Sequence, residues 1–154
     1  MPLKQFIAAD AVMGSLKVLN KKQALQEISE RAAKISGLGE REIFDALWQR
    51  EKLGSTGIGN GIAIPHCKLP RAGRIFGLFI HLDHPIDFDA TDGAPVDLIF
   101  VLIAPEGAGA DHLKALSQIA RTLRGTSYTQ MLRATHDDGA LYTLLTGAQE
   151  SDAA

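Results

Sequence analysis

A nearly unbroken apolar stretch at residues 96–104 constrains the fold more than any other part of this sequence. Nearly every position in it is apolar, which is the pattern of a strand that other elements cover on both faces. The longest apolar run inside it, residues 98–104, is far too short to cross a bilayer. The stretch therefore predicts a buried strand, in a chain that is not inserted in a membrane.

Extended and helical patterns alternate on either side of this strand. Asn20 fits the N-cap of a first helix, with Gln23 in the capping-box position and Gly37 as its stop. The remaining elements follow from apolar spacing. We predict further strands at 16–19, 62–64 and 75–82, and further helices at 40–52, 110–123, 127–134 and 137–145. Interleaved helices and strands predict an α/β fold, built as a three-layer sandwich.

Length and composition set the domain organisation and exclude some functions. A chain of 154 residues suits one domain, which we place at residues 1–147, with a flexible tail at 148–154. The net charge of −2 argues against a general nucleic-acid binder, which would carry a basic surface. The single cysteine, Cys67, allows no internal disulfide, and the N-terminus lacks the pattern of a signal peptide. These features predict a cytoplasmic protein.

A glycine-rich segment followed by a histidine carries the strongest chemical signal. Residues 54–61 read Gly-Ser-Thr-Gly-Ile-Gly-Asn-Gly, and His66 follows a short predicted strand. Glycines let backbone N–H groups approach an anion closely, so Ser55, Thr56 and Gly57 are candidate phosphoryl-binding residues. Arg50 could offer a planar fork to phosphoryl oxygens, and a neutral imidazole is a good nucleophile. Together these residues predict a histidine that accepts a phosphoryl group.

Two nucleotide-binding motifs fail in the glycine-rich segment, while the roles of its hydroxyls and of Arg50 stay open. The P-loop pattern fails because Asn60 stands where a lysine is required, and the dinucleotide pattern fails at Ile62. Ser55 and Thr56 could equally stabilise turns through their hydroxyls. Arg50 could be a solvated residue at the end of an amphipathic helix.

The histidines and the cysteine do not predict a metal site. His81 and His84, together with His66 and Cys67, are zinc-binding residue types. Structural zinc usually needs paired ligands in a tetrahedral arrangement, and neighbouring residues of an extended segment point to opposite faces. We therefore expect no metal and no cofactor, and interpret Cys67 as a small packing residue.

The segment from Glu51 to Cys67 resembles the phosphorylation-site signature of the fructose/mannitol-type enzyme IIA proteins of the bacterial phosphotransferase system. The signature has an acidic or amide residue, here Glu51, then a gap of six, Ile58-Gly59, two more residues, Ile-Ala-Ile-Pro-His ending at His66, and a small residue. The amino-acid sequence of the glycine-rich loop is similar to that of the nitrogen-regulatory branch of this family, enzyme IIA-Ntr. The resemblance continues through residues 85–90 and 95–98 and into the predicted helix that contains His112.

This resemblance implies a fold, a site and partners. The fold would be a mixed β-sheet flanked by helices, with residues 1–147 as one enzyme IIA type-2 domain. His66 would accept a phosphoryl group from an HPr-like phosphocarrier protein (NPr), Arg50 would balance its charge, and His112 would be a second active-site histidine. For His112 a surface position at a helix start stays open. The regulated partners would be proteins such as a potassium transporter or a sensor kinase.

Two functions from different classes fit these expectations. The first is a regulatory phosphocarrier whose phosphorylation state changes which proteins it binds. The alternative is a sugar-specific IIA component that passes phosphate to a IIB protein for fructose or mannitol uptake. A pure interaction domain with an unreactive histidine is a third hypothesis, which the intact signature makes improbable. The sequence of the glycine-rich loop and the lack of a IIB segment favour the regulatory phosphocarrier.

Overall fold

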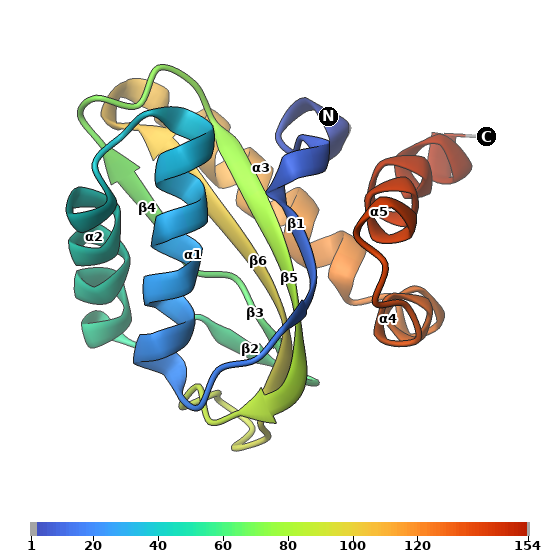
Figure 1. Ribbon diagram of the computed structural model, residues 1–154. Coiled ribbons are helices and arrows are strands. Elements are labelled where there is room, and N and C mark those ends of the chain that lie inside the picture. Colours follow the sequence, from blue (N-terminus) through green and yellow to red (C-terminus); the bar gives the residue numbers. More distant parts are fainter. Residues whose placement is uncertain (1–2, 154) are drawn as a thin grey trace.

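The computed structural model describes residues 3–153, with side chains as far as Gly147, and contains one mixed β-sheet between two layers of helices (Figure 1). Two short 3₁₀ turns open the described chain, η1 (Leu3–Gln5) and η2 (Ala9–Ala11), and a third, η3 (Glu106–Ala108), precedes α3. The strands are β1 (Val12–Leu16), β2 (Gly57–Gly59), β3 (Ile62–Ala63), β4 (His66–Leu69), β5 (Phe76–Ile86) and β6 (Val96–Pro105). The helices are α1 (Lys21–Ser36), α2 (Glu40–Leu53), α3 (Ala110–Leu123), α4 (Thr126–Arg133) and α5 (Asp138–Ala153).

Strand β6 lies inside the sheet and organises it. The strand order is β1-β5-β6-β3-β2, and β4 also pairs with β6. Strands β1 and β5 pair in parallel, as do β3 and β4 with β6, whereas β5 is antiparallel to β6. Helices α1 and α2 cover one face and α3 to α5 the other (Figure 1), so every residue from Leu98 to Ala104 is fully buried. The predicted three-layer α/β sandwich with a mixed sheet is confirmed.

The first two helices begin and end close to where the sequence predicts. The Asn20 side chain accepts a hydrogen bond of 2.8 Å from the backbone N–H of Gln23, and Gly37 ends α1 with a φ of 78°. That backbone conformation favours glycine, which has no Cβ to clash. The Gln23 side chain caps the N–H of Leu19 at 2.6 Å, so it binds one residue before the N-cap.

Most of the glycine-rich segment, expected to be a loop, belongs to a β-hairpin. Strands β2 and β3 are joined by Asn60 and Gly61, whose φ angles are 57° and 78°. An Asn-Gly pair with two positive φ angles is the usual two-residue hairpin turn. Strand β4, which begins at His66, was also missed, since four residues are too few to show a periodicity.

Three further predictions need correction. The strand predicted at 16–19 lies at Val12–Leu16 instead, and Leu19 is 86% exposed. The apolar spacing of the helix predicted at 110–123 places Leu113 on the core face, but Leu113 is 67% exposed, because α3 turns His112 inward in its place. Helix α5 runs past the predicted end before Gly147 as far as Ala153. The flexible tail predicted at 148–154 falls on residues whose side chains lie outside the described part of the chain.

None of the helices within residues 3–153 combines the length and the apolar character that crossing a membrane requires.

Candidate functional site

His66 is the first residue of β4, directly after a break in the sheet. Strand β3 pairs with β6 as far as Ile99, and β4 resumes at the pair of His66 with Leu102. Ile64 and Pro65 form the break between the two short strands, and Pro65 still accepts a backbone hydrogen bond of 3.0 Å from Leu102. A proline fits here because it has no N–H to offer a neighbouring strand. The break leaves the His66 ring half-buried at the edge of the core.

The hydrogen bonds of the His66 ring define which nitrogen is free. Nδ1 lies 2.9 Å from the carbonyl oxygen of Ile64, and a carbonyl can only accept, so Nδ1 carries the proton. Nε2 then keeps its lone pair, and it accepts a hydrogen bond of 3.3 Å from Nε of Arg50. This tautomer presents Nε2 as the nucleophilic atom.

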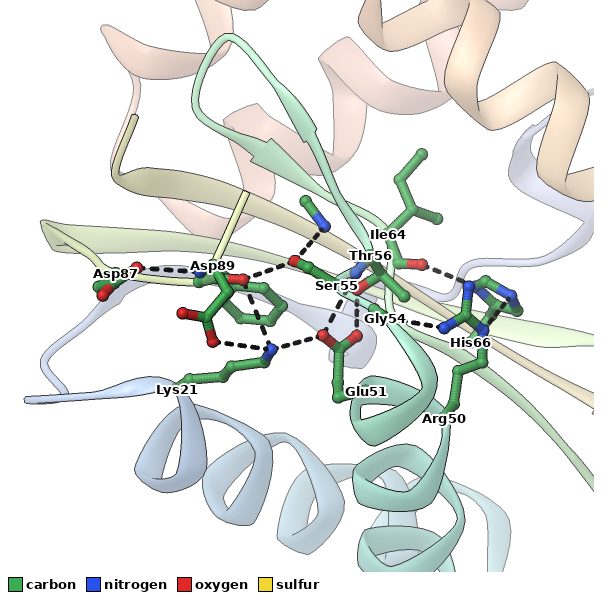
Figure 2. Close-up of polar contacts among 12 residues, drawn as sticks. Lys21, Arg50, Glu51, Gly54, Ser55, Thr56, Ile64, His66, Asp87 and Asp89 are labelled. Carbon is green, nitrogen blue, oxygen red and sulfur yellow. Dashed lines mark hydrogen bonds and ion pairs between the residues drawn. The ribbon is translucent and has the colours of Figure 1, made fainter. Parts of the chain in front are cut away.

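Arg50 comes from the last turn of α2 and is held at two points. Its Nε donates to His66, and its Nη1 donates to the carbonyl oxygen of Gly54 at 2.8 Å (Figure 2). The carbonyl of Gly54 follows the end of α2, so the helix terminus itself orients the guanidinium. The planar group therefore faces Nε2 of His66 in a fixed direction, unlike a freely solvated arginine.

His112, on the first turn of α3, lies beside His66. The two ring centroids are 5.7 Å apart at an interplanar angle of 58°, and the His112 side chain is only 6% exposed. Its Nε2 is buried and has no hydrogen-bond partner among the described residues. The structure thus brings His66, Arg50 and His112 together from β4, α2 and α3, while their chemical roles stay predictions. An unpartnered buried nitrogen beside a nucleophile is suited to bind an oxygen of an incoming group.

Both imidazoles are held towards their neutral forms. The pKa of His66 is lowered from 6.5 mainly because burial desolvates the charged ring, and the Arg50 guanidinium adds to this effect. The Ile64 carbonyl and the Glu51 carboxylate oppose the shift. Burial also lowers the pKa of His112, with further contributions from His66 and Lys68. A neutral ring is the form that can act as a nucleophile.

The other candidate phosphoryl-binding residues use their donors within their own segment, at the end of α2 and in the loop between β5 and β6. Ser55 Oγ donates to the carbonyl of Phe88 at 2.5 Å and accepts from the N–H of Gly57 at 3.0 Å. The hydroxyl of Thr56 donates to the Glu51 carboxylate, which also accepts from the N–H of Thr56 at 3.2 Å. These contacts match the turn-stabilising alternative, and phosphoryl binding by Ser55, Thr56 and Gly57 stays a prediction.

The side chains of metal-binding type lie in separate places. Cys67 is buried, and burial raises the pKa of its thiol to about 12. His81 stacks on His136 with a centroid distance of 4.4 Å and bonds the carbonyl of Thr135. Within the described part of the chain, no group of three or more His, Cys, Asp or Glu side chains is arranged to hold a metal ion.

Sequence reasoning missed one part of the site, the buried pair of Glu51 and Lys21. The Glu51 side chain is 2% exposed, and its Oε1 lies 2.8 Å from Nζ of Lys21. Glu51 is the acidic residue that opens the phosphorylation-site signature, so its position carried a signal. Lys21 carried none, because only the folding of α1 against α2 brings the two residues together.

The fold and this site agree with the comparisons to known proteins. Residues 5–147 match the model of the family described as phosphoenolpyruvate-dependent sugar phosphotransferase system, EIIA 2, and the chain belongs to that family. Figure 1 thus shows an EIIA domain, and solved relatives such as the mannitol IIA of Escherichia coli share the fold, with a TM-score of 0.77 at 20% identity over 90% of this chain and 97% of theirs.

Within the family, the resemblance to nitrogen-regulatory enzyme IIA is confirmed. The chain is 56% identical over 145 residues to a nitrogen regulatory protein of Bradyrhizobium diazoefficiens, covering 94% of this chain and 95% of that protein. It is 47% identical over 131 residues to the one of Escherichia coli, covering 84% and 80%. The crystal structure of the nitrogen regulatory protein IIA-Ntr from Neisseria meningitidis superposes with a TM-score of 0.87 at 34% identity, covering 92% of this chain and 97% of that one.

Proposed function

We propose that this protein is a regulatory phosphocarrier that accepts a phosphoryl group on Nε2 of His66 from a phosphorylated HPr-like carrier protein. The observation that carries the proposal is an unprotonated Nε2 of His66 faced by the Arg50 guanidinium, with the His112 ring, whose Nε2 is unpartnered, 5.7 Å away between ring centroids. A nucleophile with a cation and a free polar atom beside it is what phosphoryl transfer requires.

The transfer is a displacement at phosphorus. The hydrogen bond from Arg50 Nε to His66 Nε2 breaks first, and the freed lone pair of Nε2 forms the new P–N bond. The bond between phosphorus and the donor's imidazole breaks, returning its electron pair to the donor ring. Nδ1 of His66 keeps its proton on the carbonyl of Ile64. Arg50 offsets the charge of the phosphoryl oxygens, and His112 donates to one of them when its proton is on Nε2.

Regulation is favoured over sugar uptake by the names and identities of the relatives. Relatives named as nitrogen regulatory proteins reach 56%, 47% and 42% identity, although one homologue has 33%, whereas fructose-specific components reach 36% over 67% of this chain and 30% over 92% of it. The phosphoryl group adds roughly −1.5 to −2 charges, enough to change which surfaces the site attracts. By the same resemblance the donor would be an NPr-type carrier, the regulated partners a potassium transporter or a sensor kinase, and the location cytoplasmic.

Direct labelling tests the proposal. The purified chain is incubated with a phosphorylated HPr-like carrier, and the adduct is located by mass spectrometry of peptides prepared at alkaline pH. The expected product is one phosphoryl group on His66 that is labile in acid and stable in base. A chain that takes no label, or takes it on a serine or threonine, contradicts the proposal.

Arg50→Lys is expected to slow phosphoryl acceptance roughly tenfold or more, because one ammonium cannot replace the fork that contacts Gly54 and His66 together. Rates from rapid-quench measurements of labelling provide the test. Arg41→Lys on the same helix is the matched control, since the Arg41 side chain is 89% exposed. If Arg50→Lys accepts the phosphoryl group at the wild-type rate, Arg50 is only a solvated residue at the end of α2 and has no part in the transfer.

Phosphoryl acceptance is expected to persist as the pH falls through 6.5 and to decline only below it. Burial lowers the pKa of His66 from 6.5, so the neutral ring stays dominant at pH values where an unburied histidine is already protonated. The NMR shift of the His66 ring protons in the unphosphorylated chain measures this midpoint, with the urea-unfolded chain as the reference. A midpoint in the folded chain above that of the unfolded chain would contradict the expectation.

A further inference from the structure

A buried carboxylate next to Arg50 has no part in the transfer step described above. Oε1 of Glu51 lies 2.8 Å from Nζ of Lys21 and accepts the N–H of Thr56 at 3.2 Å. Its Oε2 accepts the hydroxyl of Thr56. Three donors therefore converge on one carboxylate whose side chain is 2% exposed, so its position is fixed on both oxygens.

Lys21, the first residue of α1, extends this network to the loop between β5 and β6. Its Nζ lies 3.4 Å from the carbonyl of Phe88, 3.6 Å from the carboxylate of Asp89 and 4.9 Å from the centre of the Phe88 ring (Figure 2). A buried ion pair adds little net stability over apolar residues of the same shape. The pair of Glu51 and Lys21 instead fixes four segments relative to one another: α1, the end of α2, the turn that contains Thr56, and the loop between β5 and β6.

Two paths run from Glu51 to the His66 ring, and the first consists of hydrogen bonds throughout. In the first, Glu51 holds Thr56, the carbonyl of Thr56 accepts the N–H of Ile64 at 3.0 Å, and the carbonyl of Ile64 accepts the Nδ1 proton of His66. The second path is not hydrogen-bonded throughout: Glu51 holds Thr56, two residues along the chain from Gly54, and the carbonyl of Gly54 accepts the hydrogen bond that orients Arg50 towards Nε2. Both ring nitrogens of His66 are thus positioned through contacts that begin at Glu51 (Figure 2).

We propose that Glu51, paired with Lys21, is a positioning residue for phosphoryl transfer, which keeps the proton of His66 on Nδ1 and directs Arg50 at Nε2. This inference rests on the proposed function, because it names the residue that prepares the same site. The negative charge of Glu51 acts in the same place, since it raises the pKa of His66 against the effect of burial.

Glu51→Gln tests the proposal, since glutamine keeps the length of the side chain but loses the charge and one acceptor oxygen. Lys21→Gln/Glu51→Gln is the second variant, because it removes the uncompensated ammonium that the single change leaves buried. Asp97→Asn is the matched control. The Asp97 carboxylate accepts from Nε of Arg133 at 2.9 Å and 3.0 Å and from Nη2 at 2.9 Å, in a partly buried pair beside the β2–β3 turn.

Three measurements decide whether Glu51 positions His66 or only stabilises the fold: the labelling rate, the titration midpoint of His66 and its tautomer. We expect Glu51→Gln to slow labelling roughly tenfold or more, a loss typical of a displaced reacting group. We also expect it to lower the NMR titration midpoint of His66 and to move part of the proton from Nδ1 to Nε2, seen in the ¹⁵N shifts. The double variant should behave like Glu51→Gln, and Asp97→Asn should leave all three readouts at wild-type values.

The opposite outcomes overturn the inference. A Glu51→Gln chain with the wild-type rate, midpoint and tautomer would show that Glu51 does not position His66. Recovery of the wild-type rate in the double variant would trace the defect to the unpaired Lys21. The titration and the tautomer need no phosphoryl donor. A wild-type chain that takes no label overturns the proposed function, whereas a labelled wild type with unaltered variants overturns only the role of Glu51.

Discussion

Labelling by a phosphorylated carrier protein is expected to fall to background in His66→Ala. Alanine removes the ring whose Nε2 is both unprotonated and faced by the Arg50 guanidinium. The neighbouring Cys67 cannot substitute, since burial raises the pKa of its thiol to about 12 and leaves almost no thiolate at neutral pH. His112 is expected to contact the phosphoryl oxygens and not to accept the group itself, because its side chain on α3 is only 6% exposed.

The fold of the His66→Ala chain should remain intact, because the ring is only half-buried at the edge of the core. Circular dichroism and the thermal midpoint provide this check. His84→Ala, which removes an exposed imidazole from β5, is the control and should label like wild type. Undiminished labelling of His66→Ala would mean that another residue accepts the phosphoryl group.

Deletion of the gene is expected to leave growth on fructose and mannitol unchanged, while nitrogen- or potassium-linked physiology shifts. A transport component must hand its phosphoryl group to a IIB protein at a rate that matches sugar flux. A regulator needs only a lasting change of charge at its binding face, and a dianion on His66 supplies one. Growth rates on single carbon and nitrogen sources, and growth at limiting potassium, measure the difference.

Complementation by charge variants sharpens this test. His66→Ala fixes the uncharged state and His66→Asp adds a negative charge at the same place, so the two should restore different phenotypes. Affinity capture from extracts with the same two variants would identify the partners that each state binds. Loss of growth on one sugar, restored by wild type alone, would favour the transport alternative.

Much of the fold could be predicted because it depends on local signals. The buried strand β6 shows in its composition, and α1 shows in the Asn20 cap and the Gly37 stop. The hairpin of β2 and β3 was missed although its Asn60-Gly61 turn is a known local signal. The glycines around it were interpreted as a phosphate cradle, which stays a prediction, and two of them, Gly57 and Gly59, are strand residues.

Packing decided other features that no local pattern carries. Helix α3 has an apolar residue, Leu113, beside its buried face, and only its contact with the sheet decides that His112 is buried and Leu113 exposed. Strand β4 exists because residues 66–69 meet the second half of β6 across a long separation in sequence. Such long-range pairing leaves no periodicity in a segment of this length.

By itself, the sequence determined the fold class, the family and the candidate reactive residue. The buried strand and the signature ending at Pro65-His66 can both be recognised from residues that are close together in the sequence. Only the tertiary structure decided how that residue is prepared. The proton on Nδ1 depends on the carbonyl of Ile64, the direction of Arg50 depends on Gly54, and the site of Glu51 depends on Lys21 from another helix. Hydrogen bonds and ion pairs act over a few ångströms, and such distances between segments are set only when the chain folds.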